Sequence, residues 1–216
     1  IEFTDKEITP WAGILMLKKM LDRMDFDGCL EDLNLPEQGS NRGYSSEQLI
    51  KQFMTSVWCG ANKFEHTEVT RQDEVLRQFW GFERMAGHKS FQRFFNKFDQ
   101  ATNQKVFTPL YQWFFRNLQF NNFTLDVDST IHTRYGNQQG AKKGYNPKKP
   151  GRLSHHPLMA FVAETKMVAN FWLRSGDSYT SNNIEAFLDD TFEKLQGKKV
   201  GLFRADSGFY DKKVLE

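Results

Sequence analysis

The sequence has few cysteines, no long apolar run and no recognisable targeting segment. Its two cysteines, Cys29 and Cys59, form no CxxC pair and are too few for a disulfide framework, which fits a reducing compartment. No stretch approaches the ~18 consecutive apolar residues of a membrane-spanning helix, and the N-terminal residues lack the basic and apolar blocks of a signal peptide. These absences exclude disulfide-rich secreted proteins and integral membrane proteins, so we expect a cytoplasmic protein.

Several common catalytic and ligand-binding motifs are also missing. There is no glycine-rich phosphate loop of the P-loop type. The neighbouring His155 and His156 point apart and have no cysteine or histidine cluster around them, which argues against a zinc site. Ser154 and His155 are adjacent in sequence, and adjacent residues rarely satisfy the geometry of a catalytic triad.

What the chain does contain is enough apolar material for a core. It has 216 residues, of which 39% are hydrophobic, with 21 phenylalanines. That is sufficient for one large domain or two small ones. The formal net charge of +2 is too small to indicate a partner, so the distribution of charge along the chain is more informative.

Residues 1–120 are predicted to be helical. Thr9 is a candidate N-cap with Pro10 in the first helical position, and Ser45 with Gln48 forms a capping-box pattern for a helix that ends near Gly60. Apolar residues recur at helical spacing in five stretches: 9–24, 45–60, 67–82, 90–100 and 108–118.

The stretch 90–100, which Ser90 is expected to cap, follows a short glycine-containing turn and has two distinct faces. Its apolar face is predicted to pack in a core rather than stack on bases, and consists of Phe91, Phe94, Phe95 and Phe98. A helix-turn-helix would place the opposite face on duplex DNA; an ordinary solvated face is the alternative. That polar face consists of Gln92, Arg93, Asn96 and Lys97.

The pattern changes near residue 120, where strand signals begin. A strand over 124–130 alternates Leu125 and Val127 with Asp126 and Asp128. Two β-rich runs then form a hairpin, followed by a helix that Ser181 is expected to cap and a further strand. Their ranges are 158–165 and 167–174 for the hairpin, 181–197 for the helix and 200–205 for the strand. We therefore expect a helical region, 1–120, followed by a mixed α/β sheet domain, 121–216.

The aspartates at the strand ends are candidate catalytic residues. Asp128 ends one strand and is followed by Ser-Thr, and Asp206 ends another and is followed by Ser-Gly. Ligands often bind at strand ends in α/β sheets, and two neighbouring carboxylates repel each other unless a cation lies between them. Mg²⁺ favours one or two carboxylates, water and phosphate. The alternative is a half-exposed strand with its polar residues in water.

The long connection 131–157 is basic and contains no acidic residue. Glycines and prolines are expected to keep it irregular, and its uncompensated charge next to the first acid suits a DNA backbone. A flexible solvated loop is the alternative. Its basic residues are Arg134, Lys142, Lys143, Lys148, Lys149 and Arg152.

Four segments resemble a known family. "LDVDST", "GYNPKKPGRLSHHPLMAFVAET", "NFWLRSGDS" and "RADSGFY" are similar to motifs of insertion-sequence DDE transposases of the thirteen-eighty group, over about residues 121–211. The resemblance implies an RNase H-like core in which Asp128 and Asp206 are catalytic and bind Mg²⁺ or Mn²⁺. Asp126 is the second candidate for the first acid. The resemblance also implies that the protein binds double-stranded DNA, namely the terminal repeats of the element and the target. It further implies a homodimer of the intact protein and a bacterial protein associated with the nucleoid.

One element of the family pattern has no counterpart. The resemblance implies a third acid, a Glu on a later helix, and the sequence ends at Glu216 without that context. We therefore expect a transposase fragment that cuts by two-metal phosphoryl transfer only when intact, and that is inactive alone. The alternatives are a DNA-binding remnant without catalysis and an unrelated RNase H-like nuclease. The helical first half favours a dedicated DNA-binding region over a minimal nuclease.

Overall fold

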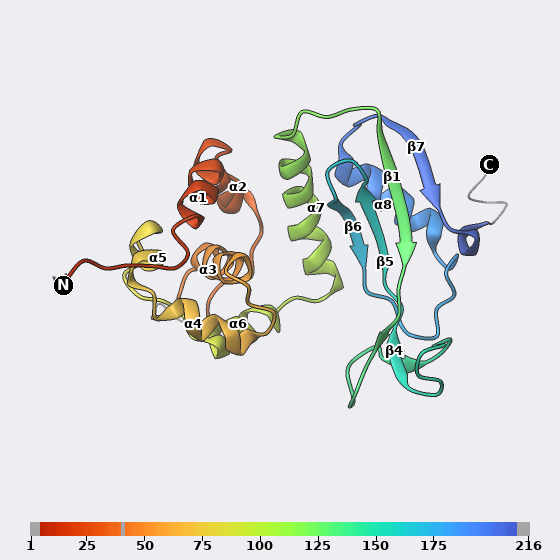
Figure 1. The fold of residues 1–216 in the computed structure, drawn as a ribbon, viewed down its shortest axis with the longest axis horizontal. Helices are drawn as coiled ribbons and strands as arrows, with labels where there is room; N and C mark the ends of the chain where they lie inside the picture. The colour runs from red at the N-terminus through yellow and green to blue at the C-terminus, as the bar shows by residue number, and fades with distance from the viewer. Residues whose placement is uncertain (1–4, 40–41, 211–216) are drawn as a thin grey trace. The chain divides into compact units, whose positions relative to one another are not determined.

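The computed structural model describes residues 5–39 and 42–210, and the chain divides into two compact units, Ile1–Leu110 and Tyr111–Glu216. Helices come first along the chain, and a sheet region follows (Figure 1). The predicted mixed α/β class, with helices preceding a sheet, is confirmed. No helix among the described residues combines the length and the apolar character needed to cross a bilayer.

The first unit is built from short helices around an aromatic core. Phe91 and Phe94 are buried, and Phe53, Phe95 and Phe98 pack against them, so the predicted apolar face of 90–100 does lie in a core. The helices are α1 (Ile14–Arg23), α2 (Phe26–Asp32), α3 (Ser46–Trp58), η1 (Phe64–His66), α4 (Thr67–Arg71), α5 (Glu74–Phe79), α6 (His88–Phe95) and the first turns of α7 (Gln100–Arg116).

Local capping signals predict some helix ends correctly. Ser45 caps α3, since its hydroxyl accepts a hydrogen bond from the Gln48 amide at 3.1 Å. The helix ends at Trp58, and Gly60 adopts a left-handed φ of 98° just after it. Gln48 does not complete the capping box, because its side chain donates to the Arg84 carbonyl instead.

Other helix boundaries differ from the prediction. The helix α1 begins at Ile14 rather than after Thr9, whose hydroxyl accepts from the Trp11 amide in a preceding turn. The stretch 67–82 forms two short helices, α4 and α5, rather than one. The helix α7 begins at Gln100 rather than near 108: Asp99 accepts from the Thr102 amide, and Pro109 lies inside the helix.

The second unit is centred on a four-stranded sheet with the order β6-β5-β1-β7. The pairs β1–β5 and β5–β6 are antiparallel, whereas β1 and β7 are parallel. The predicted hairpin and the final strand are confirmed. The elements are β1 (Phe123–Ser129), β5 (Leu158–Val162), β6 (Met167–Trp172), α8 (Ile184–Leu195), β7 (Val200–Ala205) and η2 (Ser207–Phe209).

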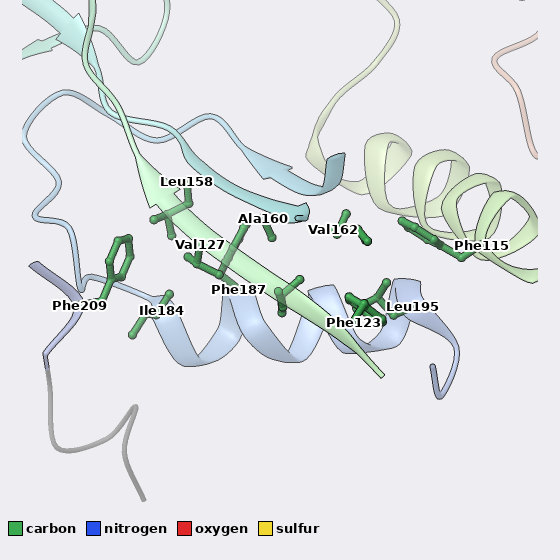
Figure 2. Packing of buried hydrophobic residues seen from close by; sticks show 12 residues of the cluster. Phe115, Phe123, Val127, Leu158, Ala160, Val162, Ile184, Phe187, Leu195 and Phe209 are labelled. Atoms are coloured by element: carbon green, nitrogen blue, oxygen red, sulfur yellow. The ribbon is translucent and has the colours of Figure 1, made fainter. Parts of the chain in front are cut away.

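The helix α8 covers one face of this sheet and forms the core with it (Figure 2). Leu125 and Val127 of β1 are buried, as alternation predicts, and Phe187 of α8 lies among them. The helix begins at Ile184 after Asn183 in a left-handed conformation, without a side-chain cap, so the prediction that Ser181 caps it is wrong.

Residues 131–157 are more ordered than predicted. They contain a second, three-stranded sheet, β2-β4-β3, made of β2 (His132–Thr133), β3 (Lys142–Lys143) and β4 (Leu153–His155). Two glycines fix this small sheet against the segment after β6. A Cβ added to Gly144 would lie 1.8 Å from the Gly176 carbonyl oxygen, and one added to Gly176 would lie 2.3 Å from the Ser154 carbonyl oxygen. Only glycine permits this backbone contact.

Candidate functional site

The two predicted acids lie at the ends of two neighbouring parallel strands: Asp128 is the second-last residue of β1, and Asp206 directly follows β7. Val127 of β1 is paired with Ala205 of β7. Asp128 and Asp206 are the residues that directly follow this pair. Adjacent strands lie ~4.8 Å apart, and residues in register point to the same face. Both acids are exposed. The fold therefore puts the two exposed aspartates at the same end of two neighbouring strands.

Each of these carboxylates is oriented by one backbone amide. Oδ1 of Asp128 accepts from the Ser129 amide at 2.7 Å, and Oδ1 of Asp206 accepts from the Gly208 amide at 2.9 Å. Within the described residues, neither Oδ2 accepts a hydrogen bond. Each side chain is thus held in place with one oxygen left for a further ligand.

Asp126 is on the same face of β1 but is already paired. Arg204, directly opposite on β7, donates from Nε and Nη2 to its two oxygens at 2.6 Å each. The hydrogen bonds from Arg204, followed by the charges of Arg204 and Lys166, lower the pKa of Asp126. This bidentate pair links β1 to β7 and engages both carboxylate oxygens of Asp126.

The adjacent histidines are both buried and have separate partners. Nδ1 of His155 accepts from Arg134 Nε at 2.9 Å, so its Nε2 carries the proton that it donates to the Gln139 carbonyl. Nδ1 of His156 donates to the Ser178 carbonyl at 2.7 Å, so Nε2 accepts from the Ser129 hydroxyl at 3.1 Å. Of the two histidines, only His156 forms a hydrogen bond with a residue adjacent to one of the acids, namely Ser129, which follows Asp128.

The basic residues of 131–157 lie on or beside the small sheet, and all but Arg134 are exposed. Lys142 pairs with Asp177 at 3.2 Å, so its charge is compensated from outside the connection. Among the described residues, Lys143 and Lys148 form no ion pair. Lys149 and Arg152 lie over the exposed ring of Tyr135, with 5.0 and 5.8 Å to its centroid.

The predicted DNA-reading face of the first unit is only partly helical. Gln92 and Arg93 lie in α6, whereas Asn96 is its C-cap and Lys97 follows it. Arg93, Asn96 and Lys97 are exposed and Gln92 is half-buried. Lys97 Nζ donates to the Glu37 carbonyl, which draws it toward the protein.

A divalent cation fits the chemistry of the acid pair. Mg²⁺ takes one or two carboxylates and completes its shell with water and phosphate oxygens, and Asp128 and Asp206 supply two carboxylates with unshared oxygens. In the part of the chain that the structure describes, no cluster of three or more His, Cys, Asp or Glu side chains could enclose a metal.

Sequence reasoning missed Arg204 and His156 as parts of this site. Arg204 could have been found, because it precedes Asp206 by two residues and so shares its face. The contact of His156 with Ser129 joins residues 27 positions apart, and no local pattern indicates it.

Comparison with known proteins gives one family match. The family described as "Transposase DDE domain group 1" matches residues 1–216. No curated protein matches. Among solved structures, the chain is similar to the "piggyBac transposase synaptic complex with hairpin DNA", determined by cryo-EM, with a TM-score of 0.43 and 14% identity. The alignment covers 89% of this chain and 43% of that one, so the chain spans less than half the length of that transposase.

Proposed function

Because the chain belongs to the transposase DDE domain group 1 family, we propose that it cuts and joins DNA at the ends of a mobile element. Asp128 and Asp206 are its catalytic carboxylates. The observation that supports this proposal is the parallel register of β1 and β7, because each acid is the residue after a paired position, Val127 and Ala205, at the same end of neighbouring strands.

The carboxylates' task is to hold divalent cations against a scissile phosphate. Bound Mg²⁺ or Mn²⁺ supplies charge stabilisation for the attacking and leaving oxygens of phosphoryl transfer. Asp128 and Asp206 each offer the oxygen that their backbone amide does not engage. Asp126 supports the site by fixing Arg204 and the register of β7. The resemblance calls for a third acid on a later helix, which would complete the ligand set.

The strand arrangement supports an RNase H-like core. An antiparallel run, β6-β5-β1, is extended by β7 parallel to β1, and α8 covers one face. The region 1–120 is proposed to bind element-end DNA through the α6 face, and the small sheet within 131–157 to contact phosphates near the acids. Exposed lysines that lack ion-pair partners among the described residues, Lys143 and Lys148, suit such contacts.

The deciding experiment measures DNA cutting and DNA binding separately. A form of the protein that carries the third acid implied by the resemblance is incubated with element-end DNA and Mg²⁺ or Mn²⁺. Nicking is expected, and Asp128→Ala and Asp206→Ala should each abolish it without weakening DNA binding. Residues 1–216 without that acid should bind the DNA without cutting it.

Asp126→Ala is the matched comparison, since it removes a carboxylate from the same face of the same strand. Reduced but measurable cutting is expected. If Asp126→Ala abolishes nicking and Asp128→Ala does not, the first acid is assigned wrongly. If neither Asp128→Ala nor Asp206→Ala affects nicking, the chain is better described as a DNA-binding protein without this active site.

A further inference from the structure

The segment 174–182, between β6 and α8, contacts the chain beside both acids. On one side, the Thr180 hydroxyl lies 3.5 Å from that of Ser129, the residue after Asp128. On the other side, a Cβ added to Gly208 would lie 3.1 Å from Thr180 Cγ2, so the threonine methyl packs closely against that glycine. The amides of Ser129 and Gly208 are the ones that orient the two carboxylates. Segment 174–182 therefore contacts the residue that orients Asp128 and the residue that orients Asp206.

A buried arginine holds this segment in shape. Arg174 is 7% exposed and donates from Nη1 to the carbonyls of Tyr179, Thr180 and Asn182, with distances of 3.0, 3.3 and 2.7 Å. Its Nε donates to the His156 carbonyl at 3.0 Å, and the His156 amide donates back to the Arg174 carbonyl at 3.0 Å. The guanidinium of Arg174 thus connects the start of the segment to its end and to His156, which lies between β4 and β5.

The partners of Arg174 are unusual for a buried cation. Among the described residues it forms no ion pair with a carboxylate, and burial lowers its pKa to about 10. A buried charge without a counter-charge is unfavourable unless carbonyl dipoles surround it. Lysine could not replace it, because a single ammonium cannot reach both the His156 carbonyl and the three carbonyls of the segment.

His156 connects the segment to the first acid. Its Nδ1 donates to the Ser178 carbonyl, and its Nε2 accepts the Ser129 hydroxyl proton. His156 is 6% exposed, and both hydrogen bonds are partly buried. The side chain of Ser129 is thereby anchored by His156, while its amide orients Asp128.

We propose that Arg174 and His156 are positioning residues for the acid pair, fixing the backbone after Asp128 and after Asp206 so that both carboxylates meet one cation. This inference rests on the proposed function of the pair. Neither side chain touches the reacting groups; each acts through residues 178–182 and Ser129. Partners that orient metal-binding side chains in this way commonly change metal affinity by ten- to a hundredfold when lost.

Two substitutions of His156 separate its two hydrogen bonds. His156→Asn places an amide near Nδ1 and keeps the bond to the Ser178 carbonyl, but loses the acceptor for Ser129. His156→Gln places its amide near Nε2 and keeps an acceptor for Ser129. Mn²⁺ affinity of the 216-residue chain, measured by titration followed by electron paramagnetic resonance, should fall about tenfold in His156→Asn. It should fall clearly less in His156→Gln.

His155→Asn is the control, because His155 is equally buried at 4% and its ring also makes two hydrogen bonds. Its partners, Arg134 and Gln139, belong to the small-sheet region and not to the acid pair. His155→Asn should leave Mn²⁺ affinity unchanged, even if it lowers the melting temperature. Arg174→Lys should weaken Mn²⁺ binding, and if it fails to fold, the His156 variants decide.

Hydrogen exchange provides a readout that needs no metal. The amides of Ser129 and Gly208 should exchange faster in His156→Asn than in His155→Asn. Mn²⁺ affinity and exchange rates that are the same in His156→Asn as in the wild type would overturn the positioning role. Asp128→Ala and Asp206→Ala distinguish this failure from a failure of the proposed function: if they do not weaken Mn²⁺ binding either, the acid pair itself is misassigned.

Discussion

Single buried polar side chains decide how α8 is held on the sheet. Lys194 is 7% exposed and donates to Asp190 Oδ2 at 2.6 Å and to Asn170 Oδ1 at 2.7 Å. Asp190 Oδ2 also accepts from Trp172 Nε1 at 2.6 Å. Burial raises the pKa of Asp190, but the hydrogen bonds from Lys194, Asn170 and Trp172 outweigh it, so the pKa is lowered overall. The network joins β6 to α8.

Lys194→Met is expected to destabilise the protein by roughly 3–5 kcal/mol, the typical effect of leaving one member of a buried ion pair without its partner. The free energy of unfolding from urea denaturation measures this. Lys199→Met, in the same part of the chain but with an exposed side chain, should change it by less than about 0.5 kcal/mol. Equal effects of the two substitutions would contradict the importance of the network.

For single residues, the sequence predicts correctly which side chains of β1 are buried and which are not. The period of two along β1 predicts that Leu125 and Val127 face the core and that two aspartates share the other face, as observed. It could not separate Asp126 from Asp128. The difference lies in Arg204, which is 78 positions away and pairs with Asp126 alone.

At the scale of elements, α6 takes its N-terminal cap from another helix. Its own N-cap is Gly87, which has no side chain to offer. Glu68 of α4 accepts from the His88 amide at 2.7 Å instead, and also from His88 Nδ1 at 2.7 Å. The hydrogen bond from the His88 amide, followed by that from Arg71, lowers the pKa of Glu68 to about 2.

This pKa predicts a specific acid response. Because the folded-state pKa is below the ordinary value of 4.5, Glu68 stabilises the protein above pH 4.5, and this contribution is lost as the pH falls toward 2. Glu68→Gln should lower stability at pH 7 by about 1 kcal/mol, the usual effect of losing an N-cap. It should also reduce the acid sensitivity of the melting temperature between pH 4.5 and 2.

Glu65→Gln is the matched substitution, since Glu65 lies on the neighbouring turn and is exposed. It should leave both the stability at neutral pH and its acid dependence nearly unchanged. An acid response that is identical in the Glu68→Gln variant and the wild type would show that this carboxylate does not cap α6.

Whether a helix start could be predicted from the sequence depends on whether its capping residue is near it in the sequence. The start of α3 was predicted correctly because its cap, Ser45, is the adjacent residue. The prediction that Ser90 caps α6 was wrong: the helix begins at His88, and its capping group comes from 20 positions earlier. Long-range caps have no signature in a local window.

At the scale of the whole molecule, DNA binding should depend on exposed cations of the small-sheet region. Lys143→Ala and Lys148→Ala should each reduce the slope of log affinity against log salt by up to about one. Lys142→Ala should have a smaller effect, because Asp177 already pairs with that lysine, and Asp177→Ala should strengthen binding. Fluorescence anisotropy over a range of salt concentrations measures these slopes. A slope unaffected by Lys142, Lys143, Lys148 and Lys149 together would remove this region from the interface.

The first unit should contribute separately. Replacing Gln92, Arg93, Asn96 and Lys97 by Ala should weaken binding to element-end DNA at moderate salt. The melting temperature of the variant must be compared with that of the wild type, because Lys97 also bonds to the Glu37 carbonyl. A stable variant with unchanged affinity would exclude this face from DNA binding.

The alternation of core and acid along β1 limits how this protein can change by insertion or deletion. Inserting or deleting one residue between positions 123 and 129 would exchange the two faces of β1. A carboxylate would then point into the apolar core that β1 forms with α8, and Leu125 or Val127 would point toward solvent. Evolution can therefore vary this strand by substitution, but insertions and deletions of a single residue should be absent from any library of variants selected for activity. The positions of the two aspartates and the folding of the sheet therefore depend on the same register.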